Sequence, residues 1–168
     1  MLFIKSILKR AIMETNDYSY GIVPLRLSGA DYEILLSKSK RYDYFQIAKG
    51  HKEHRETNIQ AAIRELQEET GHSPTMFLGV DGWTNDQTLA SPIDPIIYVF
   101  TSKKGRPIRK HVIYYIALVE KTGEIADTEE VEFVQWFPLN RETGNMLLHR
   151  ENIEHYNNFI LHKLNPHL

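Results

Sequence analysis

The chain has 168 residues, a formal net charge of −2 and no cysteine. Its 42% hydrophobic and 25% charged residues are typical of a globular domain and exclude a disordered chain. The lack of cysteine excludes disulfides, thiolate metal ligands and a cysteine nucleophile. The small net charge gives no reason to expect a DNA partner, and no apolar run approaches the roughly 20 residues that span a bilayer. We expect a cytoplasmic protein without a transmembrane segment.

The N-terminal stretch MLFIKSILKRAIM combines apolar and basic side chains, with no acid before Glu14. A signal peptide would need a longer apolar centre and a small-residue cleavage site. A short helix that packs on the domain is the favoured interpretation, and an interfacial anchor or transit-like leader is the alternative. We therefore expect a leader or short helix over residues 1–15 and a single domain over residues 16–168.

Several segments have the composition and alternation of β-strands. Residues 20–27 and 32–38 are predicted as two strands around an SGAD turn, and Pro24 indicates an edge or a bulge in the first. Further strands are expected at residues 75–80, 95–101, 111–120 and 131–139. A last helix is expected over residues 151–164, where one face would carry Ile153, Tyr156, Ile160, Leu161 and Leu164.

The clearest predicted helix covers residues 58–70. Thr57 and Gln60 form a capping-box pattern, and Gly71 is a C-terminal stop signal. An apolar stripe at helical spacing consists of Ile59, Ala62, Ile63 and Leu66. Because strands come in runs, with one helix between them and one after, we expect an α/β fold with a mixed or antiparallel sheet.

The predicted helix contains the run RELQEETGH, in which Glu65, Glu68 and Glu69 are close neighbours. Like charges at these spacings repel by about 0.2–0.5 kcal/mol per pair. Three carboxylates on one flank of a helix suit a hard divalent cation such as Mg²⁺ or Mn²⁺, which would remove the repulsion. A solvated acidic face is the alternative, and it is favoured for this run taken alone.

The wider spacing favours the metal site. The chain reads Gly50, five residues, Glu56, seven residues, then Arg64-Glu65-Leu66-x-Glu68-Glu69-x-Gly71. This pattern resembles the Nudix box, the signature of Nudix hydrolases. One position departs from it, because His72 stands where the family usually has an aliphatic residue.

The resemblance implies an α/β/α sandwich that hydrolyses a nucleoside diphosphate linked to another group. It implies that Glu65, Glu68 and Glu69 are catalytic and bind Mg²⁺, with Mn²⁺ as a substitute. The backbone carbonyl of Lys49 commonly adds a ligand. Structural roles within the motif fall to Gly50, Glu56, Arg64 and Gly71.

Two flanking segments resemble the asymmetric diadenosine tetraphosphate hydrolases. In YFQIAKGH, Phe45 takes the aromatic position and Lys49-Gly50-His51 matches, whereas Ala48 replaces the usual proline. RPIRKHVIYYIALVE resembles the basic stretch and aromatic strand of the same group. Glu130, six residues before Trp136, corresponds to a glutamate that often contributes to the metal site. The resemblance covers most of residues 18–140.

A basic stretch precedes the aromatic strand, and Arg109 and Lys110 are its best candidates for polyphosphate contacts. Lys103 and Lys104 fit a solvated hairpin tip equally well. Tyr114 and its neighbour point to opposite faces of a strand, so we expect Tyr114 to stack on a base and Tyr115 to be core. The expected substrate-binding residues are therefore Phe45, Lys49, His51, Arg109, Lys110 and Tyr114.

His51 and His54 have a spacing that also occurs in zinc sites, but no third nitrogen or sulfur ligand is evident nearby. We expect His51 to contact a phosphate or nucleotide and His54 to be an exposed loop residue.

Taken together, these motifs predict metal-dependent hydrolysis of a pyrophosphate bond in a nucleoside polyphosphate. A dinucleoside polyphosphate such as diadenosine tetraphosphate is the favoured substrate, and it would yield two nucleotides. The alternatives are RNA 5′-triphosphate ends, (d)NTPs and diphosphoinositol polyphosphates. A catalytically silent nucleotide-binding module is a further alternative, against which the intact box glutamates argue.

Overall fold

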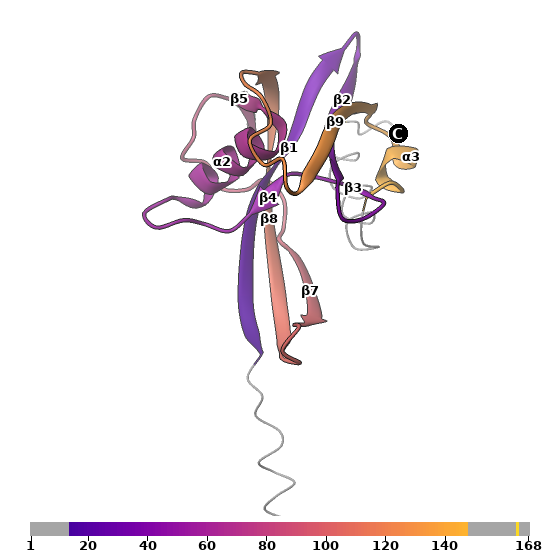
Figure 1. The fold of residues 1–168 in the computed structure, drawn as a ribbon. Helices are drawn as coiled ribbons and strands as arrows, with labels where there is room; N and C mark the ends of the chain where they lie inside the picture. Colours follow the sequence, from indigo (N-terminus) through magenta and orange to yellow (C-terminus); the bar gives the residue numbers. More distant parts are fainter. Residues whose placement is uncertain (1–13, 148–163, 165–168) are drawn as a thin grey trace, which may run out of the picture.

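The structure, a computed structural model, describes residues 14–147 and residue 164 (Figure 1). Within these residues, two helices and one sheet of nine strands are present. The strands are β1 (Thr15–Ser28), β2 (Asp31–Ser39), β3 (Phe45–Gln46), β4 (Lys49–Gly50), β5 (His72–Gly79), β6 (Gly82–Thr84), β7 (Ile96–Thr101), β8 (Pro107–Lys121) and β9 (Val131–Pro138). The helices are α2 (Asn58–Thr70) and α3 (Arg141–Gly144). No helix of the described part is long and apolar enough to cross a membrane.

The sheet is mixed, as the sequence predicts. Its main path runs β3-β2-β1-β8-β5-β6, while β4 pairs with β1, β7 with β8 and β9 with β2. The central pair is parallel, and it aligns residues 15–25 of β1 with residues 108–118 of β8. All the other pairings among the described strands are antiparallel. The long β1–β8 pair lies at the centre of the sheet, and the remaining elements are arranged around it (Figure 1).

The sequence predicts an edge or a bulge at Pro24. Its strand, β1, is an inner strand, so an edge strand is excluded. On the side of β1 away from β8, pairing with β4 stops at Gly21 and pairing with β2 starts at Leu25. Pro24 occupies the interval between these two partners. A proline cannot donate a ladder hydrogen bond, and this interval needs none.

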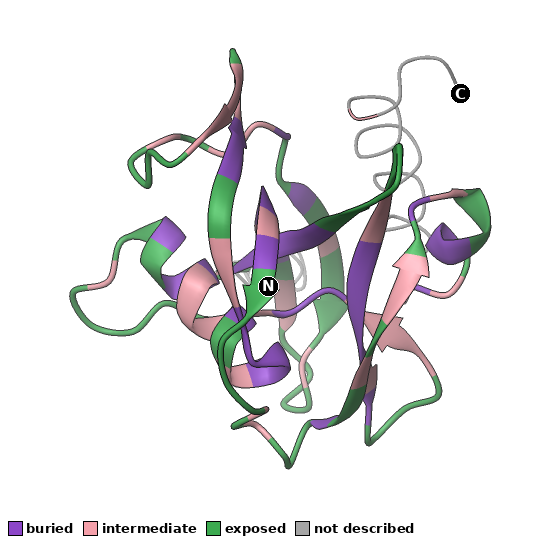
Figure 2. Cartoon of the chain, turned by 90° about the horizontal axis from the view of Figure 1, so that it is seen from above, coloured by how far each residue is buried: buried purple, intermediate pink, exposed green. Residues whose placement is uncertain are grey.

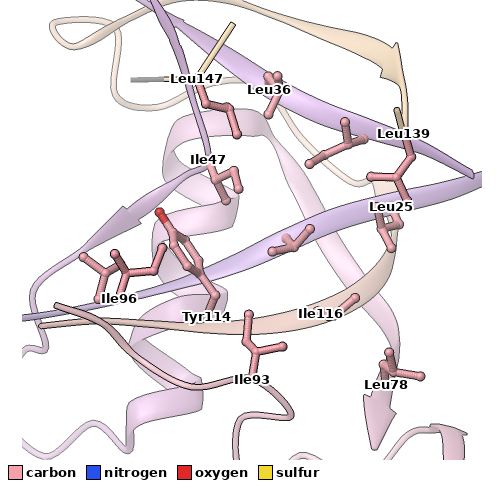
Figure 3. Close-up of a cluster of buried hydrophobic side chains, with 13 residues drawn as sticks. Leu25, Leu36, Ile47, Leu78, Ile93, Ile96, Tyr114, Ile116, Leu139 and Leu147 are labelled. Carbon is pink, nitrogen blue, oxygen red and sulfur yellow. The ribbon is translucent and has the colours of Figure 1, made fainter. Parts of the chain in front are cut away.

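The two faces of the sheet are covered by different apolar clusters. One cluster joins α2 to the sheet through Ile59, Ala62, Leu66, Ile22 and Tyr115, among others. The other lies on the opposite face and includes Val23, Leu36, Ile47, Tyr114 and Ile116 (Figure 3). Alternate residues of β1 and β8 belong to alternate clusters, as the two-residue period of a strand requires. The buried residues therefore concentrate in the inner strands, and the loops at the rim are exposed (Figure 2).

Helix α2 begins and ends where the sequence predicts. The Thr57 side chain accepts from the Gln60 backbone N–H, and the Gln60 side chain accepts from the Thr57 N–H, so the capping box is complete. Gly71 ends the helix in the left-handed conformation, with φ of 69°. A Cβ at this glycine would lie 2.4 Å from the carbonyl oxygen of Gly123, so the close approach of the 122–127 loop also requires glycine.

Some expectations fall partly or wholly outside the described residues. The N-terminal leader over residues 1–15 does so except for its last two residues. The predicted C-terminal helix does so except for Leu164, which is helical and packs against the cluster of Figure 3. The short helix α3 was not expected. Its N-cap is Asn140, whose side chain accepts from the Thr143 N–H at 3.0 Å.

Candidate active site

A pocket of about 530 Å³ opens beside α2 where β4 meets the helix. It brings together the box glutamates and most of the predicted substrate contacts. The lining residues are Ser19, Lys49, Gly50, His51, Lys52, Glu53, Arg64, Glu65, Glu68, Glu69, Tyr98, Lys110, Asp127 and Glu130. Sequence segments more than one hundred residues apart therefore contribute to one site.

Arg64 organises the helix side of this pocket. Its Nε donates to Glu56 Oε1 at 2.8 Å, and its Nη2 donates to the His51 carbonyl oxygen at 2.8 Å. Its Nη1 donates to Glu65 Oε1 at 2.8 Å and to Glu68 Oε2 at 3.0 Å. The Arg64 guanidinium thus ties the loop before α2 to the helix and offsets the repulsion among the glutamates. The hydrogen bond from Arg64 to Glu56, together with one from the Glu53 backbone N–H, lowers the pKa of Glu56. The structure agrees with the structural roles expected for Arg64 and Glu56.

Gly50 is required because Glu65 fills the space beside it. A Cβ at residue 50 would lie 2.2 Å from the carboxyl carbon of Glu65 and equally close to its Oε1. The backbone of β4 therefore passes directly over the Glu65 carboxylate. The side chain of Glu65 is only 15% exposed, and this burial raises its pKa although Arg64 opposes the shift.

Glu69 is the most deeply buried of the three box glutamates, with 4% of its surface exposed. Its Oε1 accepts the Lys49 backbone N–H at 3.3 Å, whereas its buried Oε2 has no hydrogen-bond partner among the described residues. Burial raises the pKa of Glu69 to about 8, although the nearby Lys49 works against that rise. Burial likewise lowers the pKa of the Lys49 ammonium, and Glu69 partly offsets this. A buried oxygen without a partner indicates a missing cation or donor.

The chemistry of the lining carboxylates fits a divalent cation, since hard cations prefer carboxylate oxygens. In the conformation described, however, no three His, Asp or Glu side chains of residues 14–147 are arranged to hold a metal ion. Arg64 Nη1 instead donates to one oxygen each of Glu65 and Glu68. These two carboxylates would have to turn from Arg64 towards the free Oε2 of Glu69. Metal binding by the three glutamates and by the Lys49 carbonyl stays a prediction.

The loop before β9 adds two acids to the pocket. Glu130, expected near the metal site, lines the same pocket as Glu69. Asp127 lines it too, although no motif marks this residue and only acidic neighbours surround it in the sequence. The N–H groups of Ala126 and Asp127 donate to the Glu68 carbonyl oxygen at 2.8 and 2.9 Å, which fixes this loop to the end of α2.

The basic neighbours Arg109 and Lys110 lie on β8, and their side chains point to opposite faces of the sheet. Lys110 lines the pocket, is 7% exposed as a whole residue, and forms an ion pair with Asp17 at 2.7 Å. Arg109 points to the other face, where it is exposed and lies 3.5 Å from Glu14. Neighbouring residues of a strand face opposite ways, so both could not reach one site. Arg109 therefore does not line the pocket that Lys110 lines.

The two aromatic candidates for substrate contact lie elsewhere. Tyr114 is 3% exposed within the apolar cluster, and Figure 3 shows its ring among aliphatic side chains. Its burial raises the pKa of the phenol. Tyr115 is equally buried against α2, so neither tyrosine offers a face to a base. Phe45 packs edge-on against Phe137, with ring centroids 4.9 Å apart, and does not line the pocket. The expectation that Tyr114 stacks on a base is therefore wrong, whereas a substrate contact by Phe45 stays a prediction.

The two loop histidines differ in environment. The ring of His51 borders the pocket, and its Nε2 lies 2.8 Å from Asp17 Oδ1. His54 is exposed, as expected, and its Nε2 accepts from Arg55 Nε at 3.3 Å. Lys103 and Lys104 lie in the exposed turn between β7 and β8, which supports the solvated hairpin tip.

His72, the departure from the box pattern, is a buried histidine outside the pocket. Its Nδ1–H donates to the Thr70 carbonyl oxygen at 2.8 Å, and its ring meets Trp136 edge-on at 5.8 Å between centroids. Burial lowers the pKa of this imidazole, although the bond to Thr70 opposes the shift. The fold therefore disfavours the charged form of His72.

We predict that His72→Leu reduces the loss of stability in acid. The unfolded chain protonates His72 near its ordinary pKa of about 6.5, whereas the folded chain does so only at a lower pH. Stability is thus fully present above this pH and falls as the pH drops below it, by at most about 1.4 kcal/mol per pH unit for one proton. Urea unfolding of both proteins between pH 8 and pH 5 measures the difference. Parallel curves would contradict the buried neutral imidazole.

Comparisons with known proteins agree with this architecture. The family model described as NUDIX domain matches residues 17–159. A NUDIX hydrolase from Nitrosomonas europaea is 22% identical, with 86% of this chain and 90% of that chain covered, at a TM-score of 0.52. A C. elegans Ap4A hydrolase in a binary complex is 18% identical, with 85% and 96% covered, at 0.54. The E. coli dihydroneopterin triphosphate pyrophosphohydrolase is 14% identical, with 86% and 94% covered, at 0.56. A search among curated proteins gives no match.

The chain belongs to the NUDIX domain family, because the family model spans most of its length. Its mixed sheet with the box helix on one face is the fold expected of the Nudix α/β/α sandwich. By class it is a Nudix pyrophosphohydrolase. The identities to the solved structures are too low to carry a substrate over from any of them.

Proposed function

We propose that this protein hydrolyses a pyrophosphate bond in a dinucleoside polyphosphate such as diadenosine tetraphosphate, with Mg²⁺ as cofactor. The observation that carries the proposal is the composition of the pocket. One cavity of about 530 Å³ holds the box glutamates together with the cationic or polar side chains of Lys110, His51 and Lys49. Acids that can hold a cation and bases that can hold phosphates are both needed for a multiply charged substrate.

The chain's own residues supply binding and orientation. Glu65, Glu68 and Glu69 would hold Mg²⁺, with Glu130 and the Lys49 carbonyl as further candidates. When bound, the metal neutralises phosphate charge and lowers the pKa of a coordinated water. Lys110 and His51 would donate to phosphate oxygens, and charge-assisted bonds of this kind are about twice as strong as neutral ones. A pocket carboxylate within hydrogen-bond reach of the attacking water would accept its proton.

The size and charge of the pocket favour a long polyphosphate chain. A substrate with four phosphates carries more charge than the metal site alone can offset. Lys110 supplies a positive charge from β8, and it lines the same pocket as the glutamates of α2. The KGH motif after β3 and the basic strand resemble the diadenosine tetraphosphate branch. RNA 5′-triphosphate ends, (d)NTPs and diphosphoinositol polyphosphates are the other substrates of this chemistry.

We predict that Lys110→Met raises KM for diadenosine tetraphosphate about tenfold or more and raises KM for ADP-ribose less. A charge-assisted hydrogen bond contributes about 1.5–3 kcal/mol, and 1.4 kcal/mol is a factor of ten. Arg109→Met is the matched control, because it removes a cation from the same strand but from the face away from the pocket. Its kinetics should stay near those of the wild type.

The measurement is kcat and KM on diadenosine tetraphosphate, ATP, ADP-ribose and a triphosphorylated RNA, with Mg²⁺ and with EDTA. Products identified by chromatography assign the bond that is cleaved. A preference for another substrate, or activity that EDTA does not remove, would overturn the proposal. If Lys110→Met lowers kcat/KM equally for all substrates, Lys110 contacts the diphosphate group that they share. The preference for a long polyphosphate chain would then be unsupported.

A further inference from the structure

Asp17 connects two side chains of the pocket lining, those of Lys110 and His51. Its Oδ2 lies 2.7 Å from Lys110 Nζ, and its Oδ1 lies 2.8 Å from His51 Nε2. The two nitrogens are themselves only 3.5 Å apart. Sequence inspection singled out His51 and Lys110 but gave no role to Asp17, which precedes the expected start of the first strand.

Strand pairing places these three side chains together. In the parallel β1–β8 pair, Asp17 is aligned with Lys110. In the antiparallel β1–β4 pair, Tyr20 is aligned with Gly50, which brings the next residue, His51, back along β1 towards Asp17. Asp17 and Lys110 are therefore held by paired strands, and His51 directly follows β4.

The three residues differ in exposure in a way that assigns their roles. The His51 side chain is 69% exposed and the Lys110 side chain 9% exposed, and both residues line the pocket. The Asp17 side chain is 27% exposed, but Asp17 is not part of the pocket lining. Asp17 thus lies behind the two donors. A lysine this deeply buried needs a counter-charge, since an unpaired buried charge is costly.

The hydrogen-bond chemistry also orients the imidazole. Burial would raise the pKa of Asp17, but hydrogen bonds from Lys110 and His51 outweigh it and lower that pKa, so the group is an ionised acceptor. An ionised carboxylate only accepts, so His51 Nε2 must carry the proton that it donates to Asp17. Lys110 gives one of its three N–H donors to Asp17 and keeps two for another acceptor.

We infer that Asp17 is a positioning residue for phosphate recognition, which holds the His51 ring and the Lys110 ammonium side by side at the wall of the pocket. The inference rests on the proposed function for the identity of the anion, a chain of phosphates. Lys110 keeps two N–H donors for a phosphate oxygen, and the His51 ring is held beside it, with Nε2 3.5 Å from Nζ, without first losing side-chain freedom. Because the Nε2 proton is given to Asp17, a donation from this ring to a neighbouring oxygen of the chain has to come from Nδ1. Asp17 itself does not touch the substrate.

The test is Asp17→Asn, which keeps the size of the side chain and removes its charge. The amide offers one acceptor oxygen to two donors, so at least one of them is released. We expect KM for diadenosine tetraphosphate to rise about tenfold while kcat changes less than about threefold, because the contact is present in both ground and transition states. Asp81→Asn is the control: it makes the same charge change in the exposed turn between β5 and β6 and should alter neither constant.

A double-mutant cycle separates positioning from a structural role. If Asp17 acts through Lys110, Asp17→Asn should add little to the effect of Lys110→Met. A thermal melt of each variant checks folding. Imidazole ¹H–¹⁵N spectra provide a readout that does not depend on turnover: the His51 Nε2 resonance should shift in Asp17→Asn and stay unchanged in Asp81→Asn. Independent, additive effects in the cycle would overturn the inference.

Binding of inorganic tripolyphosphate, measured by calorimetry in EDTA, distinguishes failure of this inference from failure of the proposed function. We expect its affinity to fall about tenfold in Asp17→Asn. If the wild type hydrolyses no dinucleoside polyphosphate but this loss of affinity is seen, the substrate assignment fails and the positioning role stands. If hydrolysis is seen but Asp17→Asn binds tripolyphosphate as well as or better than the wild type, the positioning role is wrong and the proposed function stands.

Discussion

Replacing Glu69 by Gln is expected to lower turnover about a thousandfold while the protein stays folded. Glu69 Oε2 is buried beside the other box glutamates, and no residue of the described part of the chain forms a hydrogen bond with it. Metal stabilisation of a phosphoryl transition state is worth several kcal/mol, and about 4 kcal/mol corresponds to a factor of a thousand. The amide has nearly the same shape as the carboxyl group but lacks the charge that a cation requires.

The fold should tolerate this change. Burial raises the pKa of Glu69 to about 8, which means that the folded state disfavours the ionised form. A neutral Gln removes that penalty, so its melting temperature without metal should equal or exceed that of the wild type. Glu129→Gln is a matched control, since this exposed acid lies outside the pocket.

A second readout for Glu69→Gln does not depend on activity. A ligand that binds only the folded state stabilises it in proportion to the logarithm of its concentration. Millimolar Mg²⁺ should therefore raise the melting temperature of the wild type and of Glu129→Gln, but not that of Glu69→Gln. Normal turnover, or an equal Mg²⁺ shift in all three proteins, would show that Glu69 is not a metal ligand.

The local parts of the fold could be predicted because local interactions determine them. The capping box at Thr57, the apolar stripe and the stop at Gly71 each act within a few residues, and α2 has the predicted bounds. The Nudix box likewise fixes a short segment, which the structure places in one pocket together with Glu130. The family membership that the motif suggested is confirmed.

The faces and partners of strands are harder to predict, because they depend on pairing between segments far apart in the sequence. Alternation predicts that Tyr114 and Tyr115 face opposite ways, but only the packing of both faces of the sheet shows that both are buried. Spacing alone could not separate Arg109 from Lys110. The acids Asp17 and Asp127 come from segments with no motif. The parallel β1–β8 pair brings Asp17 beside Lys110, and the loop fixed to α2 brings Asp127 to the pocket.

Gly50→Ala should lower turnover about a hundredfold with only a small change in stability. The new Cβ would lie 2.2 Å from the Glu65 carboxyl carbon, so the carboxylate must move. Gly50 has no positive φ, so its backbone accepts alanine without strain. What moves is the end of a flexible side chain, and displacing one metal-binding oxygen by an ångström or more can cost about 3 kcal/mol of transition-state stabilisation.

The cause can be isolated with a second substitution. Glu65→Ala alone should lose activity, and adding Gly50→Ala to it should cost nothing further, because the clashing carboxylate is gone. Gly123→Ala serves as the control, since a Cβ there meets nothing within 4 Å. Full activity in Gly50→Ala would mean that the position of Glu65 is not critical. A large fall in its melting temperature would mean that the β4 backbone, rather than the carboxylate, takes up the clash. We expect lost turnover on a stable fold, and no additional loss in the Glu65→Ala background. This result would mean that the box needs glycine at residue 50 to leave room for the Glu65 carboxylate, and not because of the backbone conformation at that residue.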